Sequence, residues 1–246
     1  MSEITRAVIL AAGQGSRLRP LTNDRPKCLI DVAGKTVLSR AIRTFRQAGI
    51  CDICIVVGYM AETIESLGYQ VLRNPRYLTD NALGSFSEAA AAWRGGAICG
   101  YADILFQAEL VSDLLRDPGA VSIAIDPNWR RRFESHWDDA QRTELVWAKN
   151  GLVQQVRRGG VDLDPTGEFI GLFKISPTDG PLLHRFLTQR LLQDEEQVRT
   201  SPMPFLLTCL INAGWAVRAV ECSSAWHEFD TPADLDRIPP DLIGAE

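Results

Sequence analysis

The 246-residue chain lacks any long hydrophobic run. No segment approaches the roughly twenty consecutive apolar residues of a membrane span, and the first apolar run, 7–12, is too short for a secretory signal. The six cysteines are scattered, and the pair Cys51 and Cys54 has no second CxxC or nearby histidine with which to form a zinc site. We therefore expect a cytoplasmic protein with reduced cysteines and no membrane partner.

Positive charge is not in excess either. The chain has 26 Lys and Arg against 31 Asp and Glu, a formal net charge of −5. This balance argues against the broad basic surface of a nucleic-acid-binding protein. An anionic substrate would need cations gathered at one place. The hydrophobic share of 46% is enough to build the core of one large α/β domain.

Short apolar runs alternate with helical patterns along the chain. The runs 7–10, 52–57 and 97–100 are typical of strands buried on both faces, and 35–48 has the apolar spacing of a helix that ends at Gly49. Further strands are predicted at 69–72, 120–125 and 215–221, and further helices at 61–67, 85–93, 181–192, 204–213 and 231–237. We expect an α/β protein built on a parallel sheet.

The part of the chain from 143 to 175 has a different pattern. Residues 143–148, 152–156 and 169–175 are typical of strands joined by tight turns. We expect 1–240 to form one domain in which 127–175 is a small antiparallel flap, with 241–246 as a C-terminal tail.

A loop of small residues follows the first strand. Its backbone can approach a ligand closely and point N–H groups at phosphate oxygens. Arg17 adds a planar cation suited to phosphate, and Lys27 adds another behind the rigid Pro26. The residues alone leave a structural turn with surface cations open. They disfavour a dinucleotide loop, because Leu18 stands where a third glycine is needed, and a P-loop, because GxxxxGK followed by Ser or Thr is absent.

The segment 10–29 reads LAAGQGSRLRPLTNDRPKCL. It resembles the signature of the nucleotidyltransferase family, LAAGxGxRLxPLT followed by PKxL, at nearly every fixed position. The resemblance implies a Rossmann-like three-layer α/β sandwich with a mixed, mostly parallel sheet, of the nucleotide-diphospho-sugar transferase type. It also implies that Arg17 and Lys27 bind the triphosphate and stabilise the transition state. It also implies that base and phosphates are held by Leu10, Ala11, Ala12, Gly13, Gln14, Gly15 and Ser16.

The same family holds Mg²⁺ with two separated carboxylates. Asp103 follows the strand 97–100, although Tyr101 and Ala102 depart from the commonest pattern, and Asp230 lies in WHEFDTPADL, which resembles the family's WxExDTxxDL. Because parallel strands bind ligands beyond their carboxyl ends, the glycine loop and Asp103 are expected in one cleft. By themselves, Asp230 also suits a helix N-cap and Asp103 a strand-end turn.

Two segments bear on the substrates. Asn81 and Ser85 resemble the Asn-x-x-x-Ser of phosphocholine and phosphonate cytidylyltransferases, which implies CTP as donor; the same residues also suit a turn and a helix cap. The stretch 168–174 resembles the family's GEFxGxxK strand, so Glu168 and Lys174 are expected to face the cleft.

The acceptor should be bound within 126–174. Trp129 and Trp137 could form part of an aromatic box for a quaternary ammonium. The run Arg130, Arg131 and Arg132, with Arg157 and Arg158 further on, could bind a more anionic acceptor, or form a solvated surface run. The predicted activity is therefore Mg²⁺-dependent transfer of CMP from CTP to a small phosphonate or phosphocholine-like acceptor, with release of pyrophosphate. A sugar-1-phosphate nucleotidyltransferase using UTP, dTTP or GTP, and a non-catalytic nucleotide-binding regulatory module, are the alternatives. The sequence leaves a homodimer open.

Overall fold

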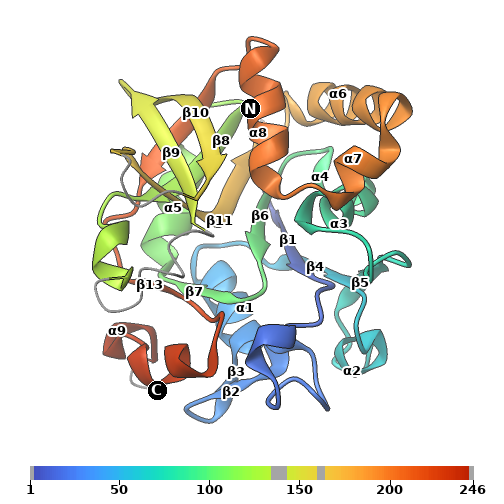
Figure 1. The fold of residues 1–246 in the computed structure, drawn as a ribbon, viewed down its shortest axis with the longest axis vertical. Coiled ribbons are helices and arrows are strands. Elements are labelled where there is room, and N and C mark those ends of the chain that lie inside the picture. Colours follow the sequence, from blue (N-terminus) through green and yellow to red (C-terminus); the bar gives the residue numbers. More distant parts are fainter. Residues whose placement is uncertain (1–2, 134–142, 160–163, 244–246) are drawn as a thin grey trace.

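A computed structural model describes residues 3–133, 143–159 and 164–243. Its centre is a nine-stranded sheet of order β5-β4-β1-β6-β11-β8-β12-β10-β9 (Figure 1). Strands β10 and β11 run against the others, so the sheet is mixed and mostly parallel, as predicted. The strands are β1 (Arg6–Ala11), β4 (Asp52–Val57), β5 (Gln70–Arg73), β6 (Ala97–Tyr101), β8 (Val121–Asp126), β9 (Glu144–Lys149), β10 (Leu152–Arg158), β11 (Gly167–Ile175) and β12 (Val217–Glu221).

Helices cover both faces of this sheet (Figure 1). Alternate side chains of β1 point to opposite faces: Val8 and Leu10 join the core under α3, α4, α6 and α8, whereas Ala7 and Ile9 join the core under α1, α2 and α5. This double burial explains the continuous apolar run of the strand. The helices are α1 (Val37–Gln47), α2 (Ala61–Glu65), α3 (Ala82–Glu88), α4 (Ala90–Trp93), α5 (Ala108–Arg116), α6 (Gly180–Gln193), α7 (Glu195–Thr200), α8 (Met203–Asn212) and α9 (Pro240–Ile243).

A third, smaller core connects the two ends of the chain. Leu18 and Val37, near the glycine loop, share it with Leu105 and with Phe229 near the C-terminus. The short strands β7 (Ile104–Phe106) and β13 (Trp226–Glu228) pair antiparallel beside it. Distant parts of the sequence are therefore packed together at the carboxyl end of β6. The remaining short strands, β2 (Asp31–Val32) and β3 (Lys35–Thr36), pair just before α1.

Several elements differ from those predicted. Helices α5 and α7 are not among the predicted elements, and the helix predicted at 85–93 is two helices that meet at Ala89. The first two residues of the predicted helix 35–48 form β3, because Thr36 caps α1 by accepting a hydrogen bond from Ser39 N. The segment 232–237 is a 3₁₀ helix.

The strands β9 and β10 are continuous with the central sheet. Strand β10 pairs with β12, and β9 pairs with both β10 and β11, so β11, β8, β12, β10 and β9 form a closed ring of pairings. The division into one domain with an acceptor-binding flap at 127–175 stays a prediction. No helix within the described ranges has the length and apolar character needed to cross a bilayer.

Candidate active site

A cavity of about 720 Å³ opens beyond the carboxyl ends of β1 and β6. This volume is typical of small-molecule sites. The glycine loop forms one wall, the start of α3 a second, and the segment from Trp226 to Asp234 a third. The fourth wall comes from the adjoining ends of β6, β9, β10 and β11. The glycine loop and Asp103 therefore share one cleft, at the sheet edge where parallel strands place their ligands.

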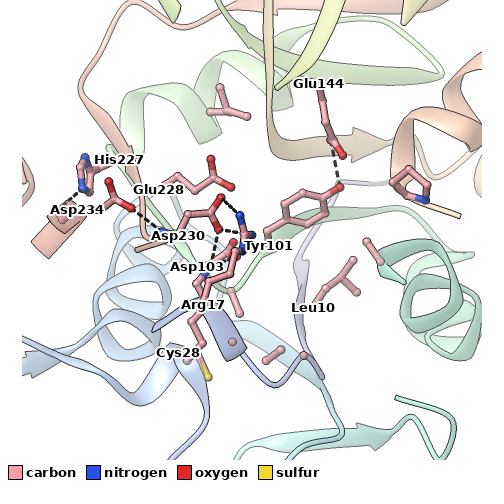
Figure 2. Close-up of a pocket in the computed structure, with 18 of the residues that line it drawn as sticks. Leu10, Arg17, Cys28, Tyr101, Asp103, Glu144, His227, Glu228, Asp230 and Asp234 are labelled. Carbon is pink, nitrogen blue, oxygen red and sulfur yellow. Dashed lines mark hydrogen bonds and ion pairs between the residues drawn. The ribbon is translucent and has the colours of Figure 1, made fainter. Parts of the chain in front are cut away.

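Three carboxylates meet at the centre of this cavity (Figure 2). Asp103 lies immediately before β7, and Glu228 is the last residue of β13, which pairs with β7. Phe229 N donates a hydrogen bond to Asp103 O at 2.9 Å, which brings Asp230 alongside. One oxygen atom from each of Asp103, Glu228 and Asp230 lies within 4.8 Å of the others.

Two cations from the glycine loop face these carboxylates. Lys27 Nζ donates to Asp103 Oδ2 at 2.7 Å and to Asp230 Oδ1 at 3.0 Å. Arg17 binds Asp230 through both terminal nitrogens, at 2.8 and 2.7 Å. A glycine at position 15 permits this approach, because its φ of +61° is left-handed and a Cβ there would lie 2.8 Å from Lys27 Cβ.

These contacts set the charge of the groups. Burial alone would lower the pKa of Lys27, but Asp103, Asp230 and Glu228 outweigh it and raise the pKa to about 12. Burial acts to raise the pKa of Asp230, and the nearby charges of Lys27 and Arg17 hold it below its usual value. Lys27 and Asp230 are therefore both ionised at neutral pH.

The carboxylates suit a hard divalent cation. Asp103 Oδ1 is buried and accepts no hydrogen bond from any described residue. A buried carboxylate oxygen without a partner is costly, and Mg²⁺ prefers oxygen ligands of this kind. Asp103, Asp230 and Glu228 are thus the residues that could hold a metal. Glu228 was not among the predicted ligands, although it occupies the Glu of the WxExDT pattern.

The interpretation of Asp230 as a helix cap is wrong. Thr231 is the N-cap of the 3₁₀ helix 232–237, and its partner in the capping box is Asp234. The carboxylate of Asp230 points instead to Arg17 and Lys27. His227 is buried, and its Nε2 lies 2.7 Å from Asp234 O.

The predicted nucleotide-binding residues line the cavity with one exception, Gln14. Asn81 also caps α3 by accepting a hydrogen bond from Ala82 N at 2.7 Å. Ser85 is buried and accepts a hydrogen bond from Asn74 Nδ2 at 3.1 Å. Asn81 and Ser85 therefore have structural roles, and their contacts with the nucleotide stay a prediction.

The prediction that Lys174 faces the cleft is wrong. Strand β11 runs antiparallel to β6, so Glu168 at the start of β11 reaches the cavity. Lys174, near the end of β11, lies at the other end of the strands, away from the cavity. The Lys174 amine is buried there and donates to the carbonyl of Asp117. Burial, the largest influence, lowers its pKa.

The predicted acceptor residues of the segment 129–137 are also placed differently. Trp129 is fully buried and does not line the cavity. Arg130 packs over the Trp129 ring, and it is Arg131 that reaches the cavity. Trp137 and the side chain of Arg132 lie outside the described residues.

Several lining residues were missed by sequence reasoning. Tyr101, Thr143 and Glu144 line the end of the cavity formed by β6, β9 and β10, beside Arg158 of the predicted arginine pair. Burial, with the charge of Glu228, raises the pKa of Glu144 to about 8, and burial raises that of Tyr101 well above its usual value. No local motif marks these residues, because strand pairing alone brings them to the cavity.

Comparison with solved structures identifies the fold class. The inositol-1-phosphate CTP transferase from T. maritima superimposes with a TM-score of 0.74 at 19% identity, over 95% of this chain and 92% of that chain. The predicted α/β fold of the nucleotide-diphospho-sugar transferase type is thereby confirmed.

The sequence comparison then gives the family. Residues 7–165 match the model of the MobA-like NTP transferase domain, and the chain belongs to this family of nucleotidyltransferases. It is 28% identical to the CTP:phosphoglutamine cytidylyltransferase of Campylobacter jejuni, over 94% of this chain and 97% of the relative. It is 29% identical to the 2-aminoethylphosphonate cytidylyltransferase of Lancefieldella rimae, over 76% of this chain and 73% of the relative.

Proposed function

We propose that the chain is a Mg²⁺-dependent cytidylyltransferase that transfers CMP from CTP to a small phosphate or phosphonate acceptor and releases pyrophosphate. The observation that carries this proposal is the meeting of Arg17 and Lys27 with three carboxylates beside the glycine loop. CTP as donor is supported by the two relatives, both of which are cytidylyltransferases by name.

Each part of the cavity has a role in this reaction. The glycine loop would hold base and phosphates, with Asn81 and Ser85 beside the nucleotide. Arg17 and Lys27 would bind the triphosphate oxygens. Asp103, Glu228 and Asp230 would hold Mg²⁺, which when bound neutralises charge on the phosphates.

The chemistry is a direct displacement. With CTP bound first, an oxygen of the acceptor forms a bond to the α-phosphorus, and the bond from that phosphorus to the α,β-bridging oxygen breaks, so pyrophosphate leaves with the bonding electrons. The acceptor oxygen is already anionic, so no general base is required. The obstacle is repulsion between two anions, which Arg17 and Lys27 reduce while the cavity aligns the reactants.

A pyrophosphate-release screen tests the proposal. CTP, UTP, dTTP and GTP are each combined with 2-aminoethylphosphonate, phosphocholine, phosphoglutamine and glucose 1-phosphate, with Mg²⁺ present. We expect turnover with CTP and a phosphate or phosphonate acceptor. Turnover of glucose 1-phosphate with UTP, dTTP or GTP would instead support the sugar-nucleotide alternative. Tight nucleotide binding without any turnover would support the regulatory module.

A further inference from the structure

The end of the cavity formed by β6, β9 and β10 contains a carboxylate that the proposed reaction does not use. Glu144 is the first residue of β9, and its side chain points to the Tyr101 hydroxyl (Figure 2). The Tyr101 hydroxyl donates to Glu144 Oε2 at 3.4 Å, close to the limit for a hydrogen bond. Within the described residues this long contact is the sole hydrogen bond of the Glu144 carboxylate, and Glu144 forms no ion pair there.

Thr143, next to Glu144, has a polar group that lacks a partner within the described residues. Thr143 is 3% exposed and lines the same cavity. Its hydroxyl has no hydrogen-bond partner among the described residues. Buried polar groups are nearly always satisfied, so the unpartnered hydroxyl of buried Thr143, next to the weakly bonded carboxylate of half-buried Glu144, indicates a ligand that brings hydrogen-bond donors.

The structure holds Tyr101 firmly in this position. Gly171 of β11 has a φ of +81°, and a Cβ at this residue would lie 2.3 Å from Tyr101 Cδ2. The glycine therefore makes the space into which the tyrosine ring packs. Phe169 lies against the same ring, edge to face, with centroids 6.1 Å apart. Packing against Gly171 and Phe169 thus holds the ring whose hydroxyl points at Glu144.

The chemistry favours a primary ammonium over a quaternary one. A primary ammonium carries three N–H donors, which the Glu144 carboxylate and the Thr143 hydroxyl can accept. A quaternary ammonium has none and is bound by the faces of aromatic rings. Here Tyr101 presents its hydroxyl, and Trp129, one of the predicted box residues, is fully buried outside the cavity.

We propose that Glu144, with Thr143 beside it, binds a primary ammonium group of the acceptor, so that the acceptor is an amino-bearing phosphate or phosphonate. This inference rests on the proposed function, since it concerns the acceptor of that reaction. The Tyr101 hydroxyl would orient the carboxylate toward the ammonium.

Two acceptors of equal shape test the ammonium directly. Propylphosphonate has a methyl group where 2-aminoethylphosphonate has its ammonium. With CTP and the wild-type protein, we expect kcat/KM for the amine to exceed that for the methyl analogue by about 100-fold or more, since a site built to bind a polar group rejects an analogue without it. We also expect phosphoethanolamine to be preferred to phosphocholine.

The variant Glu144→Gln assigns the preference to this residue. Glu144→Gln should lower kcat/KM for 2-aminoethylphosphonate at least ~10-fold, because KM for this acceptor rises. The kcat/KM for propylphosphonate should stay unchanged. Glu221→Gln, at the exposed end of β12, is the matched control and should behave as wild type.

The outcomes separate the two proposals. Equal use of the amine and methyl acceptors, a preference for phosphocholine, or an equal loss on both acceptors in Glu144→Gln would overturn the ammonium site and leave cytidylyl transfer standing. Absence of turnover with CTP and every acceptor would overturn both. The comparison of acceptors with wild-type protein does not depend on the folding of any variant.

Discussion

Lys27 and Asp103 form a hydrogen-bonded ion pair of 2.7 Å although 76 residues separate them in the chain. The pair joins a proposed triphosphate-binding cation to a proposed metal ligand. Asp230 binds the same lysine at 3.0 Å, so one ammonium partly neutralises two carboxylates. In the proposed reaction, Mg²⁺ would give the carboxylates a new positive partner, and the nucleotide would give the lysine phosphate oxygens. In this proposal the ion pair compensates these partly buried charges until the substrate replaces it.

Replacing Lys27 tests the transition-state role. Lys27→Ala should lower kcat by at least ~100-fold, the scale of losing one preorganised charge contact, measured as pyrophosphate release at saturating CTP. Arg25→Ala is the control, because that exposed arginine pairs only with its neighbour Asp24 in the described residues and does not line the cavity. Activity of Lys27→Ala within threefold of wild type would exclude the role.

Removing a carboxylate tests the metal site. We expect Asp103→Asn to lower kcat at least ~100-fold and to weaken Mn²⁺ binding, followed by calorimetry with and without a non-hydrolysable CTP analogue. Glu228→Gln should also weaken Mn²⁺ binding if Glu228 is a ligand. Chelation of the metal by EDTA should abolish turnover, and added Mg²⁺ should restore it. Unchanged Mn²⁺ affinity in both variants would argue against a metal at this cluster.

The pH dependence of stability tests the environment of Glu144. Its pKa is raised from 4.5 to about 8, so between these values the folded protein holds a proton that the unfolded chain releases. The stability contributed by the protonated carboxyl is therefore present at pH 4.5 and is lost as the pH rises toward 8. We expect Glu144→Gln to become more stable relative to wild type over this range, by about 1–3 kcal/mol.

Urea unfolding at pH 5 and pH 8 measures this difference. An ammonium bound beside Glu144 would stabilise the ionised form of this carboxyl. The acceptor amine should therefore restore part of the stability that the wild-type protein loses at pH 8. A stability difference that stays the same at both pH values would show that Glu144 titrates normally.

A buried arginine supports the wall formed by α3. Arg199 donates to Asp80 Oδ2 and to Glu88 Oε1, each at 2.6 Å, and the Asp80 side chain has no solvent exposure. Arg199→Ala would leave Asp80 buried without this compensating charge. We expect a loss of about 3–5 kcal/mol in the free energy of unfolding, measured by urea denaturation.

The matched control is Arg73→Ala, which removes an exposed ion pair with Glu62 and Glu65. Exposed pairs contribute little, so its unfolding midpoint should remain that of wild type. If both variants lost the same stability, the buried position of Arg199 would not be the reason for its effect.

Most of the fold could be predicted because its signals are local. The strands β1, β4 and β6 are apolar on both faces, and α1 has helical spacing and ends at Gln47, two residues before Gly49. Helix α5 was missed although Leu110, Val111 and Leu114 have helical spacing. The pairing of β9 and β10 with the central sheet could not be predicted, since strand order depends on contacts between distant segments.

By itself the sequence determined the loop 10–29, with its small residues and its two cations, and it marked Asp103 and Asp230 by the patterns around them. Only the tertiary structure decided what these groups meet. Pairing of β7 with β13 brings Glu228 to the carboxylate cluster, and the direction of β11 places Lys174 at the end of the strands away from the cavity. The physical reason is that a motif fixes backbone shape and side-chain type within a few residues, whereas the contacts of a charged group depend on which distant strands pair and in which direction they run.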